Sequence, residues 1–456
     1  MENMEKRRRK FRIKSIFKYI GFSLASLVTL IVVAFCVLLY GPFHQLRDLY
    51  VITMLETSAA KFMATWFLSD ETIAEILENN RLEVVDEPSD PSLVSVAVVK
   101  TTTAGSQSEP PETTPFSDTD VSAATGGPDE TTAPATSSEP PQTTTVTTLD
   151  PLHTDAPAPD ELYADHPDAM PETDGLDGLQ LVKVSGNTFT GYMLVISDPS
   201  RVSLCVSYSI LVNYTSGWNN TYGEQLRSMA KRNGAVAAIN GGAFYDPDGK
   251  GNGGRPDGAL CVEGKLIYWG PEIESAEECE AERERIRMAI ENGELAADSP
   301  EAQPPARRDW QGDKVNIIGI NNDNILILGR FTKAEFLEQG FRDAVSFDNP
   351  NPPFLVVNGK ASTVVGTGGS GIQPRTCIGQ RADGAFLFLV IDGRGAGGSL
   401  GATQKEAMNL MIEFGAVNAA NLDGGSSSEM IIDGETVSNP CSFYGPRYMP
   451  DGFMVR

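Results

Sequence analysis

A run of 22 uncharged residues near the start of the chain restricts most strongly what it can fold into. From Tyr19 to Tyr40 the sequence reads YIGFSLASLVTLIVVAFCVLLY, which as a helix is long enough to cross a bilayer. The basic cluster KRRRKFRIK precedes it, and such clusters stay on the cytoplasmic side. A cleaved signal peptide is the alternative, but the run exceeds a normal apolar region and no A-x-A site follows.

We therefore expect a cytoplasmic segment (residues 1–18), a transmembrane helix (19–40) and a cell-membrane protein whose C-terminal domain is extracytoplasmic. The formal net charge of the chain is −25, and because the first 18 residues hold eight Lys or Arg and only two Glu, the residues after them carry −31. Nucleic acid binding needs clustered cations, so we expect no nucleic acid partner. One or two arginines can still hold a small phosphorylated ligand.

Three segments follow the predicted anchor. Helical spacing predicts a juxtamembrane stalk over residues 41–85. Residues 86–175 contain stretches such as TTAPATSSEPPQTTTVTTLDP, which bury too little apolar surface to offset the entropy of ordering and predict a disordered linker. Such a linker would act as a spacer that lets the following domain reach into a surrounding wall. The folded body is expected at residues 176–456.

The body is predicted to be a mixed α/β (α+β) domain, layered, with a mixed β-sheet and flanking helices. Apolar runs bounded by glycine or polar residues predict strands, among them YMLVI, RVSLCVSY, AVAAIN, NIIGI, NILILGR, PFLVVNG and AFLFLVIDGR. GALCVEGKLIYW predicts a hairpin about Glu263-Gly264. Amphipathic helices are predicted over 332–339 and 402–414, and a charged helical insert over 271–312.

The distribution of histidine and cysteine excludes several kinds of chemistry. His44, His153 and His166 all precede the body, so a Ser-His-Asp triad or a His-ligated zinc cannot be built there. The five cysteines after the anchor are widely spaced without a CxxC, which predicts neither a disulfide scaffold nor a zinc site. We predict no metal and no cofactor. The loop Asp246–Asn252 resembles part of a calcium loop, but a polar surface loop is the preferred interpretation.

Four segments of the body share one pattern, an apolar strand that runs into a glycine-rich polar end. They are AVAAINGGAF, QPRTCIG, LVIDGRGAGGSLG and NLDGGSSSEM. Asp392 and Asp423 each precede a glycine, and Glu406 lies on the helix after GGSLGAT. Carboxylates in unlike environments are what glycoside cleavage needs, while Arg375 and Arg394 could hold a phosphate. The alternative is that these carboxylates are turn or cap residues.

Taken together, NGGAF, PRT, IDGR and NLDGGSSSEM resemble the phosphodiester glycosidase family over roughly residues 185 to 456. The resemblance implies hydrolysis of a sugar-1-phosphodiester, which releases the sugar and leaves a phosphomonoester. It implies the catalytic residues Asp423, Asp392 and Glu406, with Asp423 the main one. The implied substrate-binding residues are Asn240, Gly241, Arg375, Thr376, Arg394, Gly424, Gly425, Ser426 and Arg447.

The sequence thus predicts a membrane-anchored hydrolase that cleaves sugar-1-phosphodiester bonds in cell-surface or exopolysaccharide glycans. Its expected partners are a phosphorylated glycan or sugar phosphodiester and, through the N-terminal helix, the membrane. The alternative is a non-catalytic module that binds phosphoglycans or assists exopolysaccharide assembly. A binding module would need only the arginines and aromatic residues, whereas the enzyme also needs the carboxylates at the strand ends.

Overall fold

The computed structural model describes residues 22–57, 60–96, 178–214, 221–246, 252–270, 276–293, 314–347, 353–367, 370–442 and 445–456. By their contacts, Met1–Val96 and Asp150–Arg456 form one compact unit. The second unit, Ala97–Leu149, belongs to the expected linker and lies outside the described residues.

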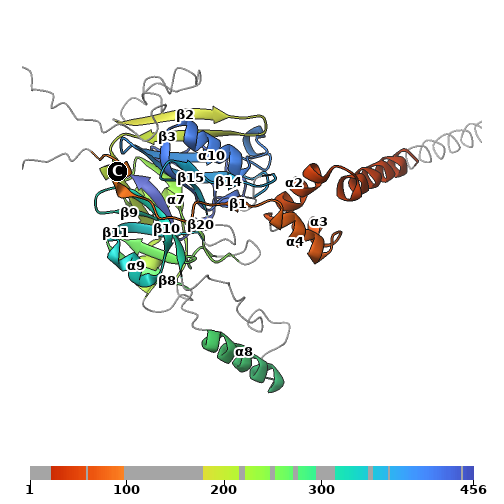
Figure 1. Ribbon diagram of the computed structural model, residues 1–456, viewed down its shortest axis with the longest axis horizontal. Helices are drawn as coiled ribbons and strands as arrows, with labels where there is room; N and C mark the ends of the chain where they lie inside the picture. Colours follow the sequence, from red (N-terminus) through yellow and green to blue (C-terminus); the bar gives the residue numbers. More distant parts are fainter. Residues whose placement is uncertain are drawn as a thin grey trace, which may run out of the picture. The chain divides into compact units, whose positions relative to one another are not determined.

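A seven-stranded antiparallel sheet forms the centre of the body, with the order β13-β12-β17-β15-β16-β3-β2. Its apolar strands are buried on both faces because a helix covers one face and further sheets cover the other. Helix α10 (Gln404–Glu413) packs Met408 and Met411 against Leu389 of the sheet (Figure 1). The strands are β2 (Leu179–Ser185), β3 (Thr190–Ile196), β12 (Phe354–Val357), β13 (Lys360–Ala361), β15 (Arg375–Arg381), β16 (Phe386–Ile391) and β17 (Ala416–Asn421).

Two five-stranded sheets share a core with the opposite face of this sheet, in which Ile239, Leu328 and Phe388 meet. The first, ordered β19-β18-β6-β21-β4, consists of β4 (Val202–Val206), β6 (Ala237–Asn240), β18 (Met430–Ile432), β19 (Glu435–Thr436) and β21 (Asp451–Val455). The second, ordered β10-β9-β11-β7-β8, consists of β7 (Ala259–Val262), β8 (Lys265–Trp269), β9 (Val315–Asn321), β10 (Leu326–Phe331) and β11 (Phe341–Ser346).

Short helices cover the outer faces of these two sheets. Helix α7 packs Met229 against β6 and β21, and α9 packs Phe336 against β9 and β11. A β5–β20 ribbon and helix α6 lie at the edges of the fold. The bounds are α6 (Tyr208–Asn213), α7 (Leu226–Arg232), α9 (Lys333–Glu338), β5 (Glu224–Gln225) and β20 (Tyr448–Met449).

The predicted class, layered sheets with flanking helices, is confirmed, but the described strand pairs are all antiparallel and lie in separate sheets rather than in one mixed sheet. The predicted hairpin is confirmed, with Glu263 and Gly264 both at positive φ, as a tight two-residue turn requires. Strand β17 was missed. NLDGGSSSEM therefore starts at the last residue of β17, which lies between β12 and β15 in the large sheet.

The helical character of the N-terminal region is confirmed. The apolar helix Phe22–Tyr40 is long and apolar enough to cross a membrane by length and composition. Three helices follow it, whereas the sequence predicted one helical stalk. They are α2 (His44–Leu55), α3 (Phe62–Thr65) and α4 (Asp70–Glu78). The described part of the charged insert contains helix α8 (Ala276–Glu291).

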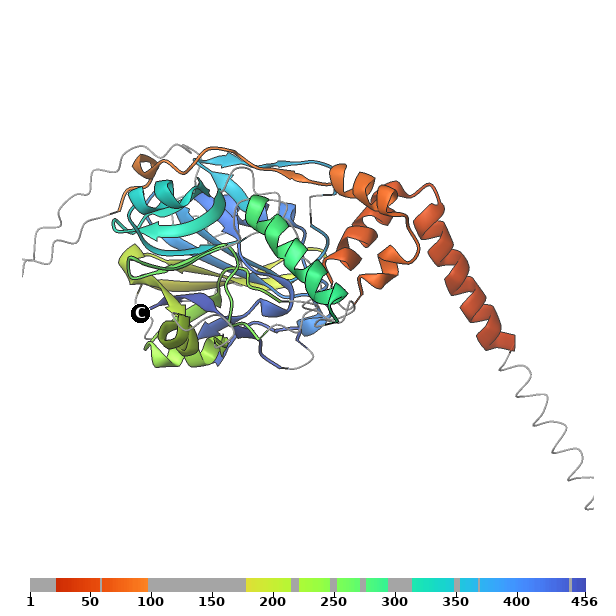
Figure 2. The same ribbon diagram turned by 90° about the horizontal axis from the view of Figure 1, so that it is seen from below.

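Residues 80–96 lie against the body, although 86–96 were expected in the disordered linker. Strand β1 (Leu82–Glu83) pairs with β14 (Thr363–Val364), and further along Ser89 donates to the Leu328 carbonyl (2.8 Å) and Ser95 to the Ala382 carbonyl (2.8 Å). Figure 2 shows this segment running along the body. The linker boundary predicted at residue 86 is therefore wrong, because residues 86–96 contact the body, whereas residues 97–175 lie outside the described residues and their role as a spacer stays a prediction.

We expect Leu82→Ala to lower the free energy of unfolding by about 2–5 kcal/mol, because Leu82 is buried against the large sheet. Leu77→Ala is the matched control on the exposed side of α4 and should change it by no more than about 0.5 kcal/mol. Denaturant unfolding of the detergent-solubilised protein measures both. Equal effects of the two substitutions would show that residues 80–96 do not stabilise the body.

Candidate active site

The side chain of Asn240, at the end of β6, joins three of the four glycine-bounded segments. Its amide nitrogen donates to the Asp423 carbonyl (2.6 Å), and its oxygen accepts from the Thr376 hydroxyl (2.7 Å) and the Glu429 N–H (3.2 Å). The backbone adds a contact, since the Asp423 N–H donates to the Gly241 carbonyl (3.1 Å). Asn240 is fully buried, where a carboxamide needs such partners. The ends of β6, β15 and β17 are thereby held together.

The glycine turn after β17 crosses the start of β15. The Gly425 N–H donates to the Pro374 carbonyl (3.0 Å), so this N–H is used within the protein and is not available to a substrate. Gly425 has φ +62°, which glycine adopts without strain, and a Cβ there would lie 3.0 Å from Nη2 of Arg394. Gly424 and Ser426 lie in the same partly buried turn. The fourth segment, IDGR, therefore meets the other three here.

Arg394 presents its guanidinium beside this glycine turn. Its φ of +54° is rare for a residue with a side chain, and its Nε donates to Oε1 of Gln373 (2.9 Å). The residue is exposed, so its fork can reach a ligand. A guanidinium oriented in this way suits two-pronged binding of a phosphate. Gln373 is a residue that the sequence interpretation missed.

Arg375 lies inside the fold. Its Nε donates to the Ala402 carbonyl (3.0 Å) and one Nη to the Gly371 carbonyl (2.5 Å). Burial lowers the pKa of this guanidinium, while the charge of Glu56, at the C-terminal cap of α2, opposes that shift. These contacts tie the loop before β15 to the segment before α10. Direct phosphate binding by Arg375 stays a prediction.

Two of the three predicted catalytic carboxylates have partners within the fold. Both oxygens of Asp392 accept from Asn439, one from its N–H and one from its side chain (2.7 Å each). Glu406 completes a capping box at the start of α10, where its Oε2 accepts from the N–H and the hydroxyl of Thr403 (2.8 Å each). These contacts are the cap and turn roles that the sequence left as the alternative.

Asp423 is the predicted carboxylate whose surroundings most resemble a reactive site. Loss of solvation raises its pKa to about 6, while a hydrogen bond from Ser427 and the charge of Arg447 act in the opposite direction. Arg447 pairs with Asp246 (2.7 Å) and lies over the Phe244 ring of the NGGAF segment. A carboxylate with a pKa near neutrality can serve as a general base at physiological pH.

Asp451, at the start of β21, is a second carboxylate of this site and was missed. It is 1% exposed and accepts from the Gly242 N–H (2.8 Å). Burial raises its pKa to about 7, and the charge of Asp423 contributes to the rise. A Cβ at position 241 would lie 2.1 Å from Oδ1 of Asp451, which explains why Gly241 carries no side chain. The Asp-Gly pair in MPDGF was the available signal.

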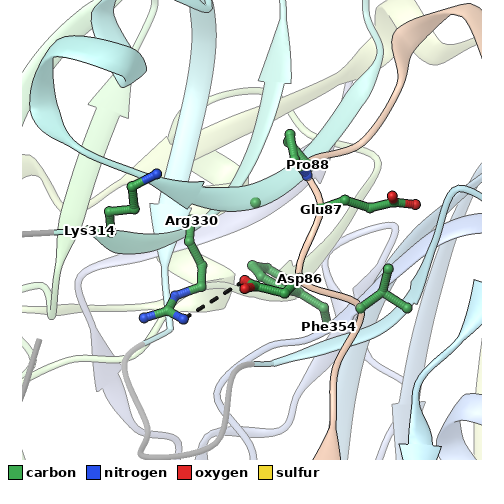
Figure 3. A pocket seen from close by; sticks show the side chains of 8 residues that line it. Asp86, Glu87, Pro88, Lys314, Arg330 and Phe354 are labelled. Atoms are coloured by element: carbon green, nitrogen blue, oxygen red, sulfur yellow. Dashed lines mark ion pairs between the residues drawn. The ribbon is translucent and has the colours of Figure 1, made fainter. Parts of the chain in front are cut away.

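A cavity of about 220 Å³ is lined by none of these motif residues; Figure 3 shows the side chains that line it. Its cationic residues are paired, Arg330 with Asp86 (3.9 Å) and Lys314 with Glu335 (3.2 Å). The cavity is lined by Val85, Asp86, Glu87, Pro88, Lys314, Gly329, Arg330 and Phe354.

Within the described residues, no group of three or more His, Cys, Asp and Glu side chains could hold a metal ion. Residues 247–251 of the loop considered for calcium lie outside the described residues.

The fold and the site together define a domain of antiparallel sheets in which carboxylates and an exposed arginine converge at glycine-rich strand ends. Residues 233–456 match the model of the phosphodiester glycosidase family. The family predicted from the four motifs is thereby confirmed for this segment.

The individual proteins that resemble this chain either align with it over a short segment or have a low sequence identity to it. The SPbeta prophage-derived protein YomE of Bacillus subtilis (strain 168) is 39% identical over 67 residues, which is 15% of this chain and only 10% of that protein. The catalytic domain of zebrafish N-acetylglucosamine-1-phosphodiester alpha-N-acetylglucosaminidase, auto-inhibited by its pro-peptide, is 18% identical, with 63% of this chain and 86% of that chain covered and a TM-score of 0.41. An exported protein of Burkholderia pseudomallei is 18% identical, with 59% and 74% covered and a TM-score of 0.34.

The raised pKa values of Asp423 and Asp451 predict how stability changes with pH. Between about pH 4 and 7 the folded protein binds more protons at these two groups than the unfolded chain does. Their contribution to the free energy of unfolding therefore falls as the pH rises through that window. We expect Asp451→Asn to lose less stability than the parent between pH 4 and 8, by denaturant unfolding at a series of pH values. Parallel curves would contradict the raised pKa.

Proposed function

We propose that the body is a hydrolase that cleaves the bond between an anomeric carbon and a phosphodiester oxygen. The observation that carries the proposal is the convergence of Asp423 and Arg394 on one glycine turn, in a segment that matches the phosphodiester glycosidase family. The sugar is N-acetylglucosamine or a close analogue by analogy with the zebrafish enzyme. The glycan substrate is carried at the cell surface or in an exopolysaccharide.

In this mechanism Arg394 holds the phosphate and Asp423 acts at the anomeric centre. At pH 7 Asp423 is mostly ionised, given its pKa of about 6, and can take a proton from the attacking water or stabilise the oxocarbenium-like charge. The water oxygen bonds to the anomeric carbon, and the phosphomonoester departs with the bonding pair. Phosphate is a good leaving group, so strong acid assistance is unnecessary. Asp392, Glu406 and Arg375 position the segments around these two residues.

The same proposal places the body outside the cytoplasm on a single-pass anchor. The apolar helix Phe22–Tyr40 supplies the span, and the basic residues before it favour a cytoplasmic N-terminus. An uncleaved helix gives a membrane-anchored protein, whereas cleavage after it would release the body.

The proposed activity is tested with the full chain in detergent, incubated with a water-soluble N-acetylglucosamine-1-phosphodiester and assayed for free sugar. We expect release by the parent, a fall in kcat of about 10²–10⁴ for Asp423→Asn, and a rise in KM for Arg394→Gln because ground-state binding of the phosphate weakens. Thermal unfolding of Arg394→Gln should match the parent, and Asp423→Asn should be at least as stable as the parent at pH 7, because it removes a charge that loses solvation on folding.

Arg227→Gln is the charge-matched control, since Arg227 pairs with Glu435 on the surface and should leave both constants unchanged. Asp392→Asn should reduce stability by weakening its contacts with Asn439. If the parent binds sugar phosphates but releases no sugar from any phosphodiester tested, the proposal of a hydrolase is wrong, and the alternative, a non-catalytic module that binds phosphoglycans, is supported instead.

A further inference from the structure

The end of the apolar helix is packed into the helices that follow it. The ring of Phe35 lies 5.1 Å from that of Phe67 and 5.9 Å from that of Tyr50, and Leu39 is 1% exposed in a cluster with residues of α2, α3 and α4. Phe35 precedes the helix end at Tyr40 by about 8 Å along the axis. With the apolar helix in a bilayer, α2 and α3 therefore lie at the depth of the interface.

These two helices also carry an exposed apolar face. Trp66 is 74% exposed and its ring lies 4.9 Å from that of Phe62, which is 44% exposed. Aromatic rings gather at the boundary between headgroups and acyl chains, and continuity with the apolar helix makes lipid the occupant that covers this face. Phe43, Leu46 and Phe67, in or next to the same helices, are exposed as well.

Helix α2 and the residues that follow it also form hydrogen bonds with the segment before β15, next to the candidate site. The Thr53 hydroxyl accepts from the Ile372 N–H (3.1 Å), and Nε2 of Gln373 donates to the Thr53 carbonyl (3.0 Å) and the Thr57 hydroxyl (3.1 Å). Gln373 in turn accepts from Nε of Arg394 (2.9 Å). One glutamine therefore connects α2 directly to the arginine that we assign to the phosphate.

A second contact fixes the helices on the body. Oδ1 of Asn80, just after α4, accepts from the N–H (2.7 Å) and the hydroxyl (2.8 Å) of Thr367, while its amide nitrogen donates to Asp48 of α2 (3.2 Å). From Tyr40 to Thr53 the chain can span at most about 30 Å, with three linking residues extended and α2 rising 1.5 Å per residue. The site is thus held close to the bilayer.

We propose that α2, α3 and α4 form a platform in the membrane interface that fixes the site at the bilayer surface, and that the substrate is a sugar-1-phosphodiester whose other ester group is a membrane lipid. This inference rests on the proposed function for the reaction and on the contacts above for the substrate class. A site that cannot leave the surface meets lipid-linked headgroups there, at a raised local concentration.

The platform is tested first by tryptophan fluorescence of the full chain in phosphatidylcholine nanodiscs that contain brominated acyl chains. We expect quenching in the parent, loss of the quenched component in Trp66→Phe, and its retention in Trp269→Phe, which alters β8 of the body. Equal quenching in the parent and Trp66→Phe would overturn the platform whether or not the protein is an enzyme.

The substrate class is tested in the same nanodiscs with two N-acetylglucosamine-1-phosphodiesters, one with a short water-soluble alcohol and one with a long-chain lipid alcohol. We expect kcat/KM to be at least about tenfold higher for the lipid-linked compound. The double variant Phe62→Ser/Trp66→Ser should lose this preference and keep its rate on the soluble compound. Leu337→Ser, an exposed residue of α9, is the matched control and should change neither rate.

The two proposals fail in different ways. Release of sugar from both compounds at equal rates, unchanged in the double variant, would overturn the lipid-linked substrate and leave the hydrolase intact. Absence of release from either compound would overturn the hydrolase, and the substrate class with it, while the quenching measurement still decides the platform.

Discussion

The buried carboxamide of Asn240 is the interaction on which the candidate site depends. It is satisfied only when β6, β15 and the turn after β17 come together, since its donor reaches Asp423 and its acceptor reaches Thr376. These elements belong to two different sheets, so one side chain couples the packing of the layers to the geometry of the site. An unpaired amide in this core would cost about 1–3 kcal/mol, which makes misaligned arrangements of the sheets unfavourable.

Much of this arrangement could be predicted because its signals are local. Apolar runs that end in glycine mark both the strands and their functional ends. At position 425, for example, glycine is needed because Arg394 lies close to it. Strand β17 escaped prediction because AVNAAN lacks β-branched and aromatic residues apart from one valine. Its buried Asn418 is satisfied by side-chain contacts with residues distant in the sequence, Ser89, Leu326 and Asn358.

The roles of individual carboxylates were harder to predict. For Glu406 the signal was present, since Thr403-Gln-Lys-Glu406 is a capping-box pattern, and its position after GGSLGAT drew attention to catalysis instead. For Asp392 the partner Asn439 lies 47 residues away. Gln373 meets α2 across about 320 residues of sequence, a contact that no periodicity or spacing encodes.

The docking of residues 80–96 on the body also changes what a break in the chain would do. Residues before 97 and after 177 belong to the same compact unit and are joined by the β1–β14 pairing and by the Ser89–Leu328 hydrogen bond. A single peptide cleavage between these positions would cut the polypeptide in two without separating its halves. Proteolysis there would therefore leave the body attached to the N-terminal helices, because noncovalent contacts and not chain continuity would hold the two together.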